Sequence, residues 1–121
     1  MRKLVVALVV AAALAPAAAL AGGWATVKLS STPEGTRAGV PWVVNLTVLQ
    51  HGVTPLADIQ PHVRITQGTI ARQFLARPTT KVGVYRARVV FPRAGMWKWS
   101  IWDGFSRTHS YKPVKVARAA V

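Results

Sequence analysis

The sequence predicts an all-β fold, in which a helical signal peptide precedes an antiparallel β-sandwich. Three observations carry this prediction. No amphipathic pattern of helical length follows residue 21. Short runs of alternating apolar and polar residues occur instead, and segments rich in Gly and Pro separate them. About seven such strands in a domain of 100 residues fit an immunoglobulin-like sandwich best.

Each predicted strand places its apolar residues at every second position, and therefore on one face of a sheet. In chain order the runs are 24–30, 42–50, 62–66, 69–76, 84–91, 96–102 and 111–117. Six of them have an inward set: Ala25, Val27 and Leu29; Trp42, Val44, Leu46 and Val48; Val63 and Ile65; Tyr85, Ala87, Val89 and Phe91; Trp97, Trp99 and Ile101; Val114 and Val116. Run 69–76 has a mixed pattern that suits an edge strand, and Pro113 favours an edge position for run 111–117.

The N-terminal segment has the pattern of a secretory signal peptide. Arg2 and Lys3 form a basic start, residues 4–15 are uniformly apolar, and Ala19-Leu20-Ala21 gives the small-x-small pattern of a cleavage site. We therefore predict a signal peptide over residues 1–21, with cleavage after Ala21. The protein is then secreted or periplasmic.

Cleavage leaves residues 22–121, which are 100 residues and one domain. The alternative is a retained membrane anchor, because the apolar run 4–21 has 18 residues and approaches the length that spans a bilayer. If the signal is cleaved, any membrane association is peripheral. If it is retained, the uncleaved signal anchors the chain.

The charge of the chain favours anionic partners. Removal of Arg2 and Lys3 with the signal lowers the net charge from +13 to +11, and only Glu34, Asp58 and Asp103 oppose it. Such a charge attracts phospholipid head groups and cell-wall polymers, whereas export argues against nucleic acid as a partner. The basic residues alternate with apolar ones, so ordinary solvated strand faces also explain them. The absence of cysteine excludes disulfides, thiolate metal ligands and cysteine nucleophiles.

Two segments resemble a known family of exported domains. The stretch GVYRARVVFPRAGMWKW, residues 83–99, resembles the G-x-Y-x-A-x-V-x-F-P-x-A-G-x-W pattern of YtkA-like and FixH-like sandwich domains. The stretch AGVPWVVNLTVLQHGVTPL, residues 38–56, is similar to their second strand and following loop. The resemblance covers most of residues 24–117 and implies an immunoglobulin-like sandwich. It also implies a function in copper handling or in the assembly of a respiratory oxidase.

Three histidines form the candidate metal site. His51 closes the second predicted strand, His62 opens the third, and His109 lies between the sixth and seventh. In an immunoglobulin-like topology these connections meet at one end of the sandwich. Imidazole is the commonest side-chain ligand of copper and zinc, and we expect copper ahead of zinc. Met96 begins its strand at the opposite end. Alternatively, His62 is solvated beside Arg64 and His51 caps the end of its strand.

Residues near His109 raise two further possibilities. Trp102, Asp103 and Phe105 are candidates for a small ligand or partner surface at the same end, although loop aromatics also fold over the end of a core. Ser106, His109 and Asp103 are the types that form a catalytic triad. Their proximity in sequence is weak evidence, and no G-x-S-x-G, Walker or H-E-x-x-H motif is present. The sequence therefore does not predict an enzyme.

Two functions remain open at this point. The first is a non-catalytic binding or accessory module of the cell envelope, with copper as the candidate cofactor through His51, His62 and His109. The second is a structural or protein-interaction domain that binds an envelope protein or an anionic envelope surface without a metal.

Overall fold

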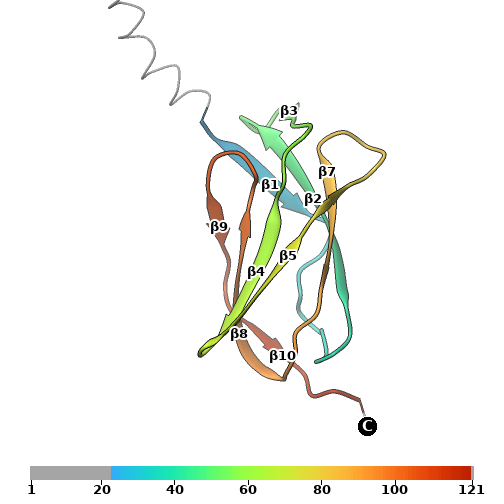
Figure 1. Ribbon diagram of the computed structural model, residues 1–121, viewed down its shortest axis with the longest axis vertical. Coiled ribbons are helices and arrows are strands. Elements are labelled where there is room, and N and C mark those ends of the chain that lie inside the picture. The colour runs from blue at the N-terminus through green and yellow to red at the C-terminus, as the bar shows by residue number, and fades with distance from the viewer. Residues whose placement is uncertain (1–22, 121) are drawn as a thin grey trace, which may run out of the picture.

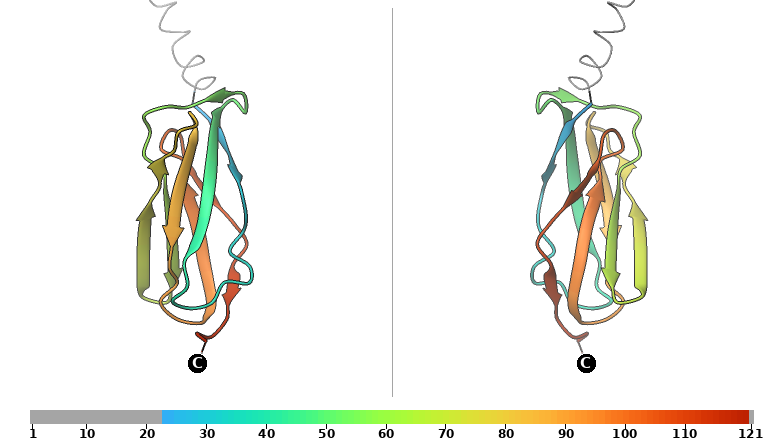
Figure 2. Two further views of the ribbon diagram at one scale, coloured as in Figure 1. Left: turned by 90° about the vertical axis from the view of Figure 1, so that its right-hand side faces the viewer. Right: turned by 90° about the vertical axis from the view of Figure 1, so that its left-hand side faces the viewer.

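The structure, a computed structural model, describes residues 23–120 as two antiparallel sheets packed face to face (Figures 1 and 2). The first sheet has the order β1 (Ala25–Leu29), β2 (Trp42–Gln50), β7 (Val84–Val89) and β6 (Arg77–Pro78), and β3 (Thr54–Pro55) pairs with β2. The second has the order β10 (Val114–Val116), β8 (Gly95–Trp102), β4 (His62–Gln67) and β5 (Ile70–Leu75), and β9 (Thr108–Ser110) pairs with β8. The predicted all-β sandwich is confirmed.

The predicted signal peptide, residues 1–21, lies outside the described residues. Within residues 23–120, no helix has the length and apolar character needed to cross a membrane.

The strand order is that of an immunoglobulin-like sandwich. β1, β2, β7 and the short β6 correspond to immunoglobulin strands A, B, E and D, while β4, β5, β8 and the pair β9 and β10 correspond to C, C′, F and G. Between the two sheets the chain passes from β5 to β6 through Ala76, which is buried. This passage brings the edge of the second sheet beside the edge of the first.

The core consists of the alternate residues that the sequence predicts to face inward. All the residues of the predicted inward sets are buried except Val27 and Leu29, which are partly buried against the core. The largest fully buried side chain is Trp97, whose ring meets that of Phe91 edge to face at 5.6 Å between centroids. The ring nitrogen of Trp97 donates to the carbonyl of Arg93 at 2.9 Å, so its one polar atom is satisfied inside the sandwich.

All seven predicted strands are present, and three short strands were not predicted. β3, β6 and β9 have two or three residues each, too few for an alternating pattern. The predicted strand 111–117 is shorter than expected, since β10 begins at Val114. Proline has no N–H to donate to a ladder, so Pro113 separates β10 from β9 on the same edge of β8.

The register brings the connections of the three histidines to one end of the sandwich. Ala25 at the start of β1 pairs with Gln50 at the end of β2, and His62 at the start of β4 pairs with Trp102 at the end of β8. This end, the histidine pole, comprises Gly23–Trp24 and the loops 51–61, 79–83 and 103–107; it lies at the top of Figure 1. His51 lies in this pole, and His62 and His109 lie in the ends of β4 and β9 that border it, so the three histidines are at one end of the sandwich, as predicted.

Candidate functional site

The loop between β2 and β4, residues 51–61, is held by hydrogen bonds on both sides. β3 folds back on β2, where Leu49 pairs with Pro55, and the amide of Leu56 donates to the carbonyl of Val48 at 3.1 Å. From β7, the hydroxyl of Tyr85 donates to the carbonyl of Leu56 at 2.6 Å and accepts from the amide of Ile59 at 3.4 Å. The loop is therefore an ordered part of the fold.

Two glycines let neighbouring loops pack closely on this one. A Cβ at Gly104, whose φ is +82°, would lie 3.0 Å from the amide nitrogen of Gln60 and 3.1 Å from Cβ of Ile59. A Cβ at Gly83, whose φ is +85°, would lie 2.7 Å from Cβ of Pro55. A side chain at either position would collide with the loop in a backbone region that favours glycine. The three loops of the pole thus form one packed unit.

Asp103 organises the loop between β8 and β9. It is fully buried, and it is the buried charged residue of the described chain. Its Oδ1 accepts from the amides of Phe105 at 2.7 Å and Ser106 at 2.6 Å, and the amide of Arg107 lies 3.2 Å away. Its Oδ2 is 2.8 Å from the Ser106 hydroxyl and 2.9 Å from Nε2 of His109. A buried carboxylate with this many donors fixes the shape of the loop.

The donors also determine the ionisation of Asp103. Burial alone would raise the pKa of its carboxyl. The amides of Ser106 and Phe105, the ring of His109 and the Ser106 hydroxyl act in the opposite direction, and the pKa ends below its ordinary value. Asp103 therefore remains a carboxylate at neutral pH.

The arrangement of Ser106, Asp103 and His109 differs from that of a catalytic triad. In a triad the histidine lies between the serine and the acid, so that it can take the proton of the hydroxyl. Here Oδ2 of Asp103 lies between the other two side chains, and the Ser106 hydroxyl bonds to the carboxylate. The cluster orders the loop. The prediction of Asp103 as part of an exposed ligand surface is wrong, because its backbone donors turn the carboxylate inward.

The other two residues of that predicted surface are accessible. Phe105 is 38% exposed at the tip of the β8–β9 loop, and Trp102 is partly buried on the outer face of the second sheet. In the same row across that sheet, His62 pairs with Trp102 on one side and with Leu75 on the other. Burial between these neighbours, followed by the nearby charge of Arg64, lowers the pKa of His62. His62 thus favours its neutral form.

The remaining two histidines have different surroundings. His51 lies at the end of β2 with φ of +54°, and its ring is 4.9 Å from the ring of Trp24. Its amide donates to the carbonyl of Trp24 at 3.2 Å, which ties the start of β1 to the end of β2. His109 faces Asp103 and lines a groove of about 660 Å³ between β1 and β9 together with Trp24.

The three histidines share a pole without forming a ligand set. Across residues 23–120, no group of three His, Cys, Asp or Glu side chains is placed to hold a metal ion. The predicted three-histidine metal site at His51, His62 and His109 is therefore not assembled. The physical reason is that each ring has separate neighbours. The ring of His51 lies beside Trp24, and that of His109 faces Asp103. His62 pairs with Leu75 and Trp102 across the second sheet.

Apolar side chains gather at the tips of the pole, and the sequence analysis named Phe105 among them but missed the other three. Four separate segments of the pole each expose one: Trp24 at 43%, Val53 at 75%, Val82 at 61% and Phe105 at 38%. We call these four residues the apolar tips. No periodic pattern identifies them, because each lies in a turn or at a strand end. Their common position follows only from the register and from the close packing of the loops.

Comparison with known proteins does not place the chain in a family. No protein-family model matches the sequence, and no curated protein matches it.

Proposed function

We propose that this chain is a non-catalytic binding and accessory module of the cell envelope, and that it rests on anionic lipid surfaces through its histidine pole. The observation that carries the proposal is the presence of the four apolar tips on one end of the sandwich. Aromatic and aliphatic side chains at loop tips gain free energy when they enter the interfacial region of a bilayer. An aqueous monomer gains nothing from exposing them there.

Basic residues accompany the tips. Lys81 precedes Val82, Arg107 follows Phe105 by two positions, and both basic residues are exposed. Residues 23–120 hold 14 Lys and Arg against three acids, a net charge of 14 − 3 = +11. Among residues 23–120 no lysine or arginine lies within ion-pair distance of a carboxylate, since the one contact of this kind is between the His109 ring and Asp103. Anionic head groups supply the missing counter-charge.

The predicted N-terminal segment is consistent with this orientation. Its apolar run, residues 4–21, joins the domain next to Trp24, at the pole. If the signal is retained, it tethers the pole to the membrane; if it is cleaved, the apolar tips and the basic residues bind without it. The copper-handling and oxidase-assembly functions implied by the YtkA-like and FixH-like resemblance stay predictions.

Vesicle binding tests the proposal. The chain is expressed with its own N-terminal segment, purified as its host processes it, and sedimented with vesicles that contain phosphatidylglycerol. The variant pair Val53→Ser and Val82→Ser weakens partitioning roughly tenfold or more, because each valine contributes on the order of 1 kcal/mol on burial. The matched control pair, Val40→Ser and Met96→Ser, removes exposed apolar side chains at the opposite end and leaves partitioning unchanged.

Two results would contradict the proposal. Equal effects of the two pairs would mean that the histidine pole is not the contact surface. The second result is equal partitioning onto anionic vesicles and onto zwitterionic phosphatidylcholine vesicles, at both low and high salt. It would mean that the positive charge of the chain does not contribute to membrane binding.

A further inference from the structure

A second surface of the sandwich combines arginines with exposed apolar side chains. Where the chain passes from β5 to β6, a groove of about 670 Å³ runs along the side of the molecule. Its basic residues are Arg77 of β6 with Arg86 and Arg88 of β7. Its apolar residues are Val43, Phe74, Leu75 and Pro78, of which Val43 and Leu75 are half exposed. We call this surface the arginine groove.

The charges of the arginine groove are not compensated within the described chain. Arg77 and Arg86 are directly opposite each other on adjacent strands, a pairing of like charges that destabilises a sheet. Arg86 donates from Nε to Oδ1 of Asn45 at 3.0 Å. The guanidinium groups of Arg77 and Arg88 have no hydrogen-bond or ion-pair partner among residues 23–120. An anion bound in the groove would offset this repulsion.

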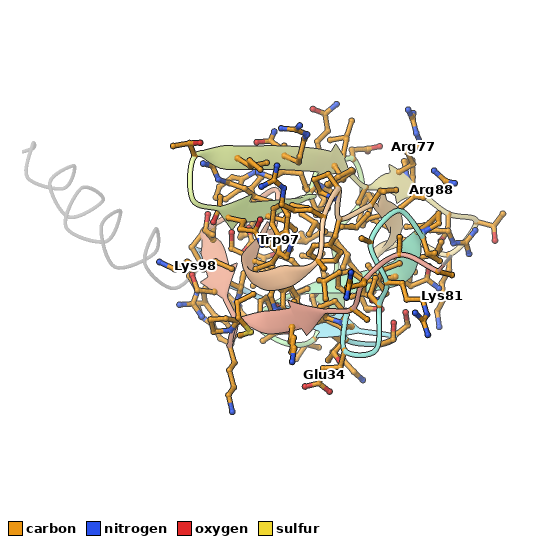
Figure 3. The ribbon with its side chains drawn as sticks, turned by 90° about the horizontal axis from the view of Figure 1, so that it is seen from below. Glu34, Arg77, Lys81, Arg88, Trp97 and Lys98 are labelled. Atoms are coloured by element: carbon orange, nitrogen blue, oxygen red, sulfur yellow. The ribbon has the colours of Figure 1, made fainter. Side chains whose placement is uncertain are left out.

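Among residues 23–120, no carboxylate forms an ion pair with an arginine of the groove. Asp103 is buried at the histidine pole, Asp58 lies in the loop between β3 and β4, and the carboxylate of Glu34 is near the hydroxyl of Thr32. Figure 3 shows Arg77 and Arg88 together on one side of the molecule, with Glu34 away from them. Since no carboxylate of residues 23–120 pairs with these arginines, their positive charge is open to an anion of another molecule.

The spacing of the arginines indicates the shape of that molecule. Arg86 and Arg88 are two positions apart on β7 and face outward together. Residues two positions apart in an extended chain are separated by roughly 6.6 Å and also face the same side. An extended peptide with acidic residues at positions i and i+2 thus matches the two guanidinium groups. The half-exposed Val43 and Leu75 provide contact for an apolar side chain beside them.

We propose that the arginine groove binds an extended acidic segment of a partner protein, with carboxylates two positions apart on Arg86 and Arg88 and an apolar residue on Val43 and Leu75. A lipid head group matches the groove less well, since it provides one phosphate, whereas β7 presents Arg86 and Arg88 two positions apart on one face. This site is independent of the membrane contact proposed for the histidine pole.

Two isomeric peptides test the spacing. The probes are fluorescein-labelled, amidated Glu-Thr-Glu-Thr-Leu and Glu-Glu-Thr-Thr-Leu, which have the same composition and charge. Fluorescence anisotropy with the full chain, purified as its host processes it, measures both Kd values at low and at moderate salt. The alternating peptide binds roughly fivefold or more tightly than its isomer, because only it can direct both carboxylates to the arginines.

A pair of charge-matched variants tests the location. Arg86→Gln with Arg88→Gln weakens binding of the alternating peptide roughly tenfold or more. The control, Arg64→Gln with Lys98→Gln, removes the same charge from the outer face of the second sheet, and Lys98 lies on the opposite side in Figure 3. All four side chains are exposed, so both double variants retain the melting temperature of the parent.

Each other outcome overturns the inference. Equal binding of the two peptides, or equal losses in the two double variants, would show that net charge alone attracts the probes. Absence of binding by either peptide would show that the groove is not a peptide site. If the groove variants lose vesicle binding and keep peptide binding, the groove binds lipid instead. Failure of the peptide test leaves the proposal for the histidine pole intact, because that proposal depends on vesicles and on Val53 and Val82.

Discussion

Replacing Asp103 by asparagine tests the structural role of the buried carboxylate. The change keeps the size of the side chain and removes its charge. Oδ1 can still accept from the amides of Phe105 and Ser106, but an NH₂ group replaces the oxygen that now accepts from the Ser106 hydroxyl and from His109. The Ser106 hydroxyl must then rotate and the His109 ring change tautomer to accept from this NH₂ group, or their bonds to residue 103 are lost. Hydrogen bonds to a charged acceptor contribute about 1.5–3 kcal/mol each.

The expected loss for Asp103→Asn is smaller than the sum of these contacts. Phe105 and Arg107 are exposed, so amides released in the variant can bond to water. We expect a decrease of about 2–4 kcal/mol in the free energy of unfolding at neutral pH. Domains of this size have about 5–15 kcal/mol in total, so the variant still folds. At about 4–8 °C per kcal/mol, the melting temperature falls by roughly 10–25 °C.

Urea denaturation followed by tryptophan fluorescence measures the loss, with Asp58→Asn as the control. Asp58 is exposed in the β3–β4 loop with φ of +58°, a conformation that asparagine also tolerates, and we expect its replacement to change stability by less than about 0.5 kcal/mol. Equal stabilities of the Asp103 and Asp58 variants would refute the assignment of Asp103 as the organising group of the loop.

The pH dependence gives a second check on Asp103. Its pKa is lower in the folded than in the unfolded chain, so its contribution is complete above the unfolded pKa and is lost as the pH falls through the folded pKa. The stability difference between the parent and Asp103→Asn is therefore largest near neutral pH and decreases below about pH 4. A difference that stays constant down to pH 2 would show that the ionisation of Asp103 does not stabilise the fold.

Two further substitutions test how the pole is packed. Tyr85→Phe removes the hydroxyl that donates to the carbonyl of Leu56 at 2.6 Å and accepts from the amide of Ile59, so we expect the free energy of unfolding to fall by about 1 kcal/mol. Hydrogen exchange at the Ile59 amide should become faster. Unchanged exchange there would show that the hydroxyl does not hold the loop. Gly104→Ala combines a positive φ with a collision, whereas Gly39→Ala has φ of +81° and open space. Thermal unfolding should show Gly104→Ala less stable than Gly39→Ala by at least about 1 kcal/mol, since overpacking typically costs 1–3 kcal/mol; equal losses would mean that only backbone strain matters.

The strands could be predicted because burial on one face enforces alternation. Val44, Leu46 and Val48 are all fully buried, as their spacing in β2 predicts. The strand boundaries depended on turn chemistry as well, and Pro113 ended the edge ladder earlier than the apolar pattern implied. The strands β3 and β6 have two residues each, too few to show an alternation of apolar and polar residues. Hydrogen bonds to their longer neighbours, β2 and β7, position them instead.

The candidate site was predictable only in part. Chain topology brings the three histidine connections to one pole, and topology follows from the number and order of strands. The orientation of each imidazole depends on contacts that are distant in sequence, such as the ring of Trp24 beside His51. The inward turn of Asp103 had a local signal, since an aspartate directly followed by glycine, here Gly104, favours a turn in which the carboxylate accepts backbone amides.

The distribution of charge links the fold to both proposed surfaces. Asp103 bonds to donors of its own loop and so cannot neutralise any arginine or lysine elsewhere. The basic side chains instead alternate outward along the strands, as Arg86 and Arg88 do, where water screens them and no carboxylate pairs with them. An anionic partner that displaces this water gains attraction without breaking an internal ion pair. For this reason the same composition supports a lipid contact at the apolar tips and a peptide contact at the arginine groove, and only their different geometries make them specific.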